Sequence, residues 1–245
     1  MISSDKNYNG VIDELVNGLW ISPSDNQQYG IPIKNIEISE TLDGKETDLI
    51  KDLHSNQKLL IVSDPFTHKA MGSRIFKNLK GNINVDEYIW EQPSSSIKGV
   101  EFLRSKLKDY DGMIAVGSGT VSDSIKYATF LEGKVYSVFA TTPMNAYTTG
   151  TASISFDGVK KSLVAHYAQG VFFDLEALSN CPKRLTAAAF ADVICRTTAQ
   201  VDWLMSHKLL NTDYTTTPYE LLALYEMDMN NNASDIAAGK IDSLA

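Results

Sequence analysis

Short apolar runs alternate with amphipathic stretches between residues 59 and 140. Strands that are buried on both faces of a parallel sheet have such continuous apolar runs, because helices cover both sides of the sheet. Four runs predict strands, over 59–62, 83–89, 112–116 and 135–139. The stretches between them repeat their apolar residues at helical spacing, over 68–79, 96–107 and 121–131. This alternation predicts βαβ units in an open, mostly parallel α/β sheet.

The pattern changes on both sides of this region. The first 45 residues predict a loop-rich segment with one or two strands near Ile31 to Ile38. After residue 150 we expect a β-hairpin that turns at Asp157-Gly158, and then a short strand over 170–174. Beyond Pro182 the spacing predicts only helices: a long one over 185–210, one that opens with a capping box at Thr217, and a last one from Ser234. A domain boundary near residue 180 follows.

Composition and charge narrow the class of protein. The chain has 245 residues, of which 43% are hydrophobic and 21% charged, as in an ordinary globular protein. Its formal charge of -8 supplies no overall basic surface, so we expect neither a nucleic-acid nor a membrane partner. The amino terminus has no signal-peptide pattern, and we expect a cytoplasmic protein. Cys181 and Cys195 lack CxxC spacing and are expected to be buried free thiols.

A glycine-containing turn, Gly117-Ser118-Gly119-Thr120, joins the third predicted strand to its helix. Glycines at such a turn let the backbone approach a ligand, and the first N–H groups of the helix face an anion. The spacing is neither GxGxxG nor that of a P-loop. A steric need for glycine between strand and helix explains the pattern equally well, so the turn alone is an ambiguous phosphate-binding signal.

Polar residues also follow the first and the fourth of these predicted strands. Asp64 comes after the first, where a carboxylate can accept hydrogen bonds from an adenosine ribose, and Thr67 is close behind it. Capping of the next helix is an equally good explanation of Asp64. Thr141 and Thr142 follow the fourth strand. Because parallel strands bring their carboxyl ends to one edge, these residues and the glycine turn together make a stronger case than any one of them.

No catalytic or metal-binding spacing is evident among the remaining candidates. The four histidines form no HExxH motif or close pair. Asp192 lies on the apolar side of an alanine-rich predicted helix, where an unpaired carboxylate is costly to bury. A metal, another cation, a water-filled cleft or partial exposure would each account for it.

Taken in order, these motifs resemble the glycerol-1-phosphate dehydrogenase group, in the superfamily that also holds glycerol dehydrogenase, iron-containing alcohol dehydrogenases and 3-dehydroquinate synthase. Residues 111–126 are similar to its GGGT-x-x-D-x-x-K loop, and residues 137–154 to its S-V-P-T-A-x-S-x-D-G-x-x-S-x-x-A-S-I segment. Residues 158–174 also fit, and Phe190-Ala191-Asp192 is similar to a G-x-G-D segment. The resemblance implies a Rossmann-like α/β dinucleotide-binding domain over 1–180 and the start of an all-helical domain over 181–245.

The resemblance also implies an NAD(P)-dependent oxidoreductase that transfers hydride between the nicotinamide and a small polyol phosphate or its ketone. It places ten residues at the cofactor, with Asp64 on the adenosine side and the glycine turn on the diphosphate: Asp64, Thr67, Gly117, Ser118, Gly119, Thr120, Asp123, Thr141, Thr142 and Thr149. Asn145 and Lys160 would be the catalytic residues that face the substrate, and Asp192 would face a divalent metal such as zinc.

Departures from the family pattern keep a second interpretation open. Ser118 stands in place of a glycine, Asn145 in place of an aspartate, and no histidine follows His207 to match the family's two metal-binding histidines. A catalytic zinc keeps three protein ligands, so Asp192 alone is not expected to hold one. The alternative is an inactive or truncated relative that serves as a nucleotide-binding or scaffold protein. A lyase of the dehydroquinate-synthase type would need more basic and histidine residues. NAD versus NADP, and whether the chain is a homo-oligomer, stay open.

Overall fold

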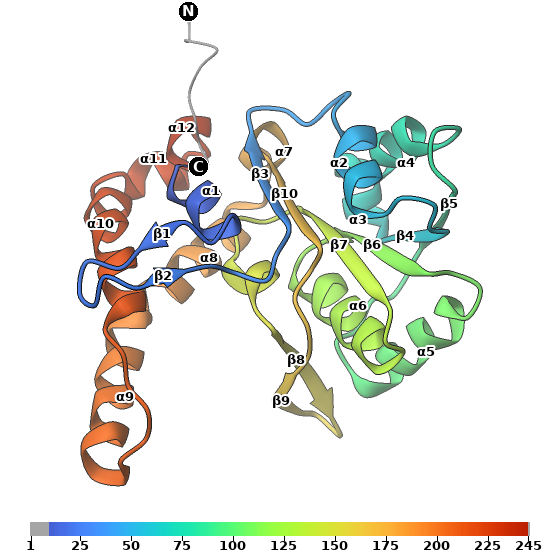
Figure 1. Cartoon of the computed structure of the whole chain (residues 1–245). Coiled ribbons are helices and arrows are strands. Elements are labelled where there is room, and N and C mark those ends of the chain that lie inside the picture. Colours follow the sequence, from blue (N-terminus) through green and yellow to red (C-terminus); the bar gives the residue numbers. More distant parts are fainter. Residues whose placement is uncertain (1–9, 245) are drawn as a thin grey trace, which may run out of the picture.

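A six-stranded parallel sheet lies at the centre of the computed structural model, which describes residues 10–244 (Figure 1). The strand order is β3-β10-β7-β6-β4-β5. Their bounds are β3 Asn35–Ser39, β4 Leu59–Ser63, β5 Val85–Ile89, β6 Gly112–Gly117, β7 Val135–Ala140 and β10 Gly170–Asp174. Strands β4 and β6 are buried along their whole length, which confirms the prediction made from their apolar runs.

Helices cover both faces of this sheet, and the alternation of side chains along β4 shows how. Leu60 and Val62 pack in one apolar cluster with residues of α5 (Ile97–Leu107) and α6 (Gly119–Leu131). Leu59 and Ile61 pack in a second cluster, with residues of α2 (Glu46–Leu53) and α4 (Ser73–Leu79). A strand with apolar neighbours on both sides has no polar face, which is why its sequence does not alternate.

The direction of the chain through the sheet reverses beside β4. From β4 the chain passes through α3 (Pro65–Thr67), the π-helix η1 (His68–Gly72) and α4 to β5 on one side. From β5 it returns through α5 to β6 on the other side of β4. Open α/β sheets bind ligands outside the carboxyl ends of the strands at such a switch point. The loops that follow β4 and β6 begin there.

The remaining elements surround the sheet. Two short hairpins are formed by β1 (Trp20–Ile21) with β2 (Gln28–Tyr29), and by β8 (Thr151–Phe156) with β9 (Val159–Val164). Figure 1 shows the β8–β9 hairpin projecting from the body. The helices are α1 Val11–Val16, η2 Asn145–Thr148, α7 Leu175–Ser179, α8 Lys183–Ile194, α9 Arg196–Leu210, α10 Thr217–Asn231, α11 Ala233–Ala237 and α12 Ile241–Leu244.

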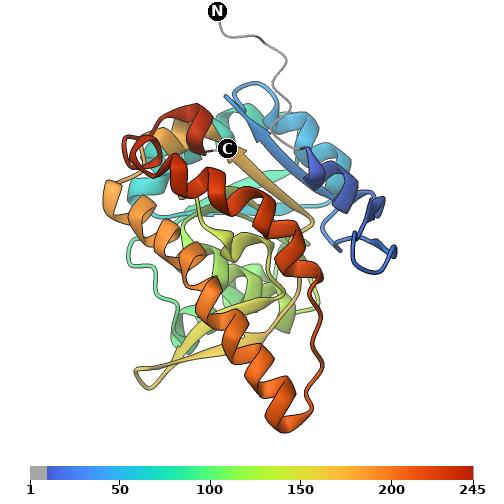
Figure 2. The same cartoon turned by 90° about the vertical axis from the view of Figure 1, so that its left-hand side faces the viewer.

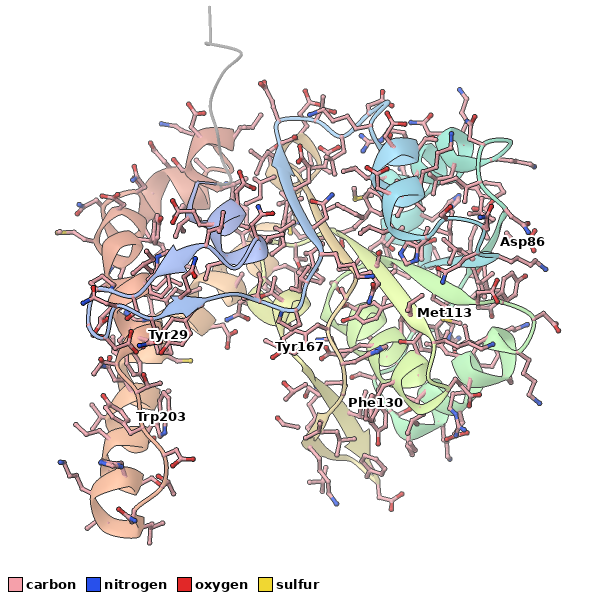
Figure 3. All side chains as sticks on the ribbon, viewed as in Figure 1. Tyr29, Asp86, Met113, Phe130, Tyr167 and Trp203 are labelled. Carbon is pink, nitrogen blue, oxygen red and sulfur yellow. The ribbon has the colours of Figure 1, made fainter. Side chains whose placement is uncertain are left out.

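The helices from α8 to α12 form an arm along one side of the sheet domain (Figure 2). The first hairpin lies on the same side: Tyr29 of β2 and Trp203 of α9 are both placed away from Met113 of the central strand β6 (Figure 3). In the part of the chain that the structure describes, no helix is long and apolar enough to cross a bilayer.

Several local predictions in the helical region are wrong. The helix expected over 185–210 is divided at Cys195 into α8 and α9, and the last helix is interrupted at Gly239, whose φ is 73°. The capping box at Thr217 is absent, because Thr216 is the N-cap and its Oγ1 donates to Glu220 Oε1 at 2.7 Å instead of binding the backbone. The thiols are not buried: Cys195 is exposed and Cys181 is half-buried.

Candidate functional site

A cavity of about 640 Å³ opens where β4, β6 and β7 end. This volume is typical of small-molecule sites. Its lining residues come from the loop after β4, from the turns after β6 and β7, and from α7, α8 and the residues between them. The cavity brings together six residues that the sequence assigns to a cofactor: Asp64, Thr67, Ser118, Thr120, Thr141 and Thr142.

The two glycines of the turn after β6 have different roles. Gly117 is buried, and a Cβ added to it would lie 2.7 Å from Cβ of Val121. Close packing of β6 against α6 therefore requires glycine at this position. At Gly119 an added Cβ would meet only the side chain of Met144, at 3.7 Å. The steric explanation thus holds for Gly117, whereas Gly119 leaves space above the first turn of α6.

The first N–H groups of α6 have no acceptor among the residues that the structure describes. Ser118 is the N-cap, but its side chain makes no capping hydrogen bond. The first N–H with an acceptor is that of Ser122, which donates to the carbonyl of Ser118 at 3.0 Å. Within residues 10–244 the N–H groups of Gly119 and Thr120 have no recorded acceptor. Unpaired N–H groups and the positive end of a 13-residue helix attract an anion, and Ser118 and Thr120 line the cavity.

Asp64 caps the helix that follows β4 and lines the cavity as well. Its Oδ1 accepts hydrogen bonds from the N–H groups of Phe66 (2.8 Å) and Thr67 (3.0 Å). In return, Oγ1 of Thr67 accepts from the N–H of Asp64 at 3.0 Å. The capping explanation is therefore realised. Both recorded bonds go to Oδ1, and the Asp64 carboxylate is oriented by them at the cavity wall.

The threonines after β7 also differ. Thr142 is buried and its Oγ1 lies 2.7 Å from the hydroxyl of Tyr147, which donates to the carbonyl of Gly117 at 3.0 Å. Burial raises the pKa of Tyr147 well above its usual value, so the phenol keeps its proton and remains a donor. Oγ1 of Thr141 is buried and has no hydrogen-bond partner in the part of the chain described. Thr142 thus holds the turn in place, while the Thr141 hydroxyl is available to a ligand.

A buried charged pair lies on α6. Lys126 is fully buried, and its Nζ donates to the carbonyls of Ala146 (2.8 Å) and Thr151 (2.9 Å) and to Oγ1 of Thr149 (3.2 Å). It also lies 3.5 Å from Oδ1 of Asp123. Burial raises the pKa of Asp123 and lowers that of Lys126, and their mutual attraction opposes both shifts. The pair attaches α6 to the loop over 145–151.

The two predicted substrate residues, Asn145 and Lys160, and the predicted cofactor residue Thr149 lie outside the cavity lining. Asn145 is exposed at the start of η2, Lys160 is exposed on β9, and Thr149 is held by Lys126. None of these three contributes to the cavity described above. Neither Lys126 nor Tyr147 is among the site residues predicted from the sequence. Their structural roles depend on the loop that each side chain contacts in the folded chain.

A family model described as iron-containing alcohol dehydrogenase matches residues 37–182, more than half of the chain. The chain belongs to this family. The relationship inferred from the motifs is therefore confirmed, and so is the α/β fold with a parallel sheet followed by helices.

Relatives of this chain include the glycerol-1-phosphate dehydrogenase [NAD(P)+] of Pyrococcus horikoshii, 31% identical over 72% of this chain and 51% of the relative. That of Geobacillus thermodenitrificans is 27% identical over 86% of this chain and 54% of the relative. The chain spans about half the length of the curated relatives it matches. Among solved structures, an archaeal Red Sea brine pool alcohol dehydrogenase has a TM-score of 0.72 at 15% identity, covering 88% of this chain and 61% of its own. Glycerol dehydrogenase of Schizosaccharomyces pombe has a TM-score of 0.60 at 17% identity, covering 66% and 42%.

Asp192, the predicted metal ligand, is exposed near the end of α8. Of the four explanations that the sequence left open for this carboxylate, exposure to solvent is the one that the structure shows. Over residues 10–244 no group of three histidine, cysteine, aspartate or glutamate side chains is arranged to hold a metal. The described residues do not by themselves fit the metal that the family name implies.

Proposed function

We propose that this chain binds NAD(P) and forms part of an oxidoreductase of the glycerol-1-phosphate dehydrogenase type, which transfers hydride between the nicotinamide and the secondary alcohol or ketone of a small polyol phosphate. One observation carries the proposal: the unsatisfied N-terminus of α6 faces a cavity at the switch point of the sheet, and Gly119 leaves room for a ligand there. The printed names of the relatives, which specify NAD(P)+, support it.

Different residues of the cavity would bind different parts of the cofactor. N–H groups of Gly119 and Thr120 would bind the diphosphate, and the hydroxyls of Ser118 and Thr141 would donate to it or to the adjoining ribose. Asp64, oriented by its cap, would accept a hydrogen bond from an adenosine hydroxyl, with Thr67 beside it. When bound, the dinucleotide supplies the hydride acceptor in one direction and the donor in the other.

The loop over 145–151 would serve the substrate side. Lys126 and Asp123 hold this loop against α6, which would place Asn145 and Thr149 toward the nicotinamide half of the site. The amide of Asn145 would orient a substrate hydroxyl, and the ammonium of Lys160 would attract the substrate phosphate. We retain Asp192 as the carboxylate on the metal side. We also retain the division into units 1–180 and 181–245 and the cytoplasmic location as parts of this proposal.

Equilibrium titration of the full chain with NADH and NADPH tests the proposal. The wild-type chain should bind at micromolar concentration, and Gly119→Ala should weaken binding by about tenfold, an effect about as large as that of one hydrogen bond. Alanine keeps the backbone N–H, so the weakening would come from the added Cβ, which occupies space proposed for the diphosphate. Because this Cβ meets only the side chain of Met144 in the protein, Gly119→Ala should unfold at the same temperature as the wild type. Lys98→Ala, on the exposed side of α5, is the matched control and should change neither property. A wild-type chain that binds neither nucleotide would exclude the proposed function.

A nucleotide-binding protein without catalysis is the second candidate. The exposure of Asn145, Lys160 and Asp192, none of which lines the cavity, favours it. To distinguish the two candidates, the chain is incubated with glycerol 1-phosphate and NAD⁺ or NADP⁺, and the absorbance of the reduced nicotinamide is measured. Turnover supports the oxidoreductase, whereas nucleotide binding without turnover supports the second candidate.

A further inference from the structure

One arginine of the chain differs from the other three in having no carboxylate partner. Arg74 pairs with Glu46 and Asp174, Arg104 pairs with Glu101 and Glu132, and Arg196 pairs with Glu226. Arg184 forms no ion pair with any residue between 10 and 244, although acidic residues outnumber basic ones by 30 to 22 in this chain. An unpaired guanidinium in an acidic protein is available to an anion from outside.

Arg184 lines the same cavity as the α6 N-terminus. It is the second residue of α8, whose first turn is fixed by hydrogen bonds from the N–H groups of Leu185 (2.7 Å) and Thr186 (3.3 Å) to the carbonyl of Pro182. The backbone of Arg184 is therefore held in place, and its side chain is exposed. No residue of this wall was identified from the sequence, although the proline at the helix start marks its position.

Charge in the cavity is carried by only two of its lining side chains. Asp64 is on the wall that follows β4, and Arg184 is on the wall formed by α7, α8 and the residues between them. The other lining residues are uncharged at neutral pH, including Thr67, Asn180 and Cys181. A carboxylate that accepts from a ribose hydroxyl suits NAD, whereas an arginine nearby accommodates the additional phosphate of NADP. The cavity contains both groups.

We propose that Arg184 binds the 2′-phosphate of NADP(H), so that the cavity accepts NADP(H) as well as NAD(H). The guanidinium presents paired N–H donors that match two phosphate oxygens, and its positive charge offsets the repulsion from Asp64. The diphosphate of either cofactor remains with the α6 N-terminus. This inference rests on the proposed function, since it specifies the cofactor of the same site.

The test is to measure Kd for NADPH and NADH with the full chain by calorimetry, for the wild type, Arg184→Gln and Lys183→Gln. Lys183 is the exposed neighbour on α8, does not line the cavity, and loses the same charge on substitution. We expect Arg184→Gln to weaken NADPH binding by about 10- to 100-fold and NADH binding by less than about twofold, as for loss of a charge-assisted contact. Lys183→Gln should alter neither Kd.

Three outcomes overturn the assignment. Equal weakening of both nucleotides would place Arg184 at the diphosphate, and an unchanged NADPH affinity would remove it from the site. An equal effect of Lys183→Gln would mean that only the general charge of α8 matters. These results differ from failure of the proposed function, in which the wild-type chain binds neither nucleotide and both proposals fall. Because Arg184 has no ion pair to lose, the melting temperature of Arg184→Gln should match that of the wild type.

Discussion

The Nζ atom of Lys126 lies 3.5 Å from Oδ1 of Asp123, and both side chains are buried between α6 and the loop that follows β7. The Lys126 ammonium donates hydrogen bonds to the carbonyls of Ala146 and Thr151. Oδ2 of Asp123 accepts from the N–H of Ser153, while Oδ1 has no hydrogen-bond partner in the described chain. One charged pair therefore connects the helix that would bind phosphate to the segment that would bind substrate.

Removing one member of this pair should destabilise the fold strongly. Lys126→Met leaves the Asp123 carboxylate buried without its counter-charge, and two loop carbonyls lose their donor. We expect the free energy of unfolding to fall by about 3–5 kcal/mol. Denaturant titration measures this change. The double variant Asp123→Asn with Lys126→Met should lose less than the single variant. A single-variant loss below about 1 kcal/mol would show that the pair contributes little.

The hydroxyls of Thr141 and Thr142 are expected to separate ligand binding from stability. Thr142→Val removes the partner of the Tyr147 hydroxyl, so the free energy of unfolding should fall by about 1–2 kcal/mol. Thr141→Val removes a hydroxyl that has no protein partner, so stability should be unchanged or higher. Nucleotide binding by Thr141→Val should nevertheless be weaker by several-fold. Thermal unfolding and calorimetric titration of both variants measure these effects. If Thr142→Val weakened nucleotide binding and Thr141→Val did not, the assignment would be contradicted.

The features that could be predicted from the sequence are those fixed by local physical constraints. Strands β4 and β6 were predictable because burial on both faces leaves a continuous apolar run, and Gly117 because a strand-to-helix turn leaves no room for a Cβ. The exposure of Asp192 was not predictable, since it depends on what packs against α8. The π-helix η1 over 68–72 and the break between α8 and α9 at Cys195 could not be predicted either, because no proline or other local signal marks them in the sequence.

The candidate site was predictable only to the level of strand ends. Parallel topology alone brings Asp64, Thr120 and Thr141 to one edge, and the structure places all three on one cavity. Arg184 reaches that cavity from a helix that is remote in sequence, so no motif could assign it. Asp64 caps a helix and also lines the cavity, so the capping alternative is confirmed, while its contact with an adenosine ribose stays a prediction.

A second buried ionic group connects three distant segments. Arg74 of α4 binds Oε1 of Glu46 at 3.0 Å and Oδ2 of Asp174 at 2.6 Å, and both carboxylates are fully buried. Arg74→Leu should therefore cost about 3–5 kcal/mol of unfolding free energy, because two buried charges lose their partner. The exposed pairs of Arg104 provide the control, and Arg104→Leu should cost less than about 1 kcal/mol. Similar losses in the two variants would contradict the importance of burial.

Stability should also fall as the pH is lowered below 7, through His54. Burial lowers the pKa of this imidazole below its usual value of 6.5. The Oε1 atom of Gln57 can only accept a hydrogen bond, so in the neutral imidazole Nδ1 carries the proton and donates to it at 2.8 Å. Nε2 then accepts from the hydroxyl of Ser137 at 2.7 Å, and Oγ of Ser137 accepts from the N–H of Gly170 at 3.1 Å.

The direction of this pH effect follows from comparing proton uptake by the folded and the unfolded chain. The unfolded chain takes up a proton at His54 as the pH falls through 6.5, whereas the folded chain resists it, so the stabilisation present above pH 6.5 is lost toward the lower folded pKa. His166, whose pKa burial also lowers, adds in the same direction. Denaturant titrations between pH 7.5 and about 5.5 should show this decline, and His54→Gln should reduce its slope. His207→Gln, on α9, is the control; an unchanged slope for His54→Gln would assign the decline to other groups.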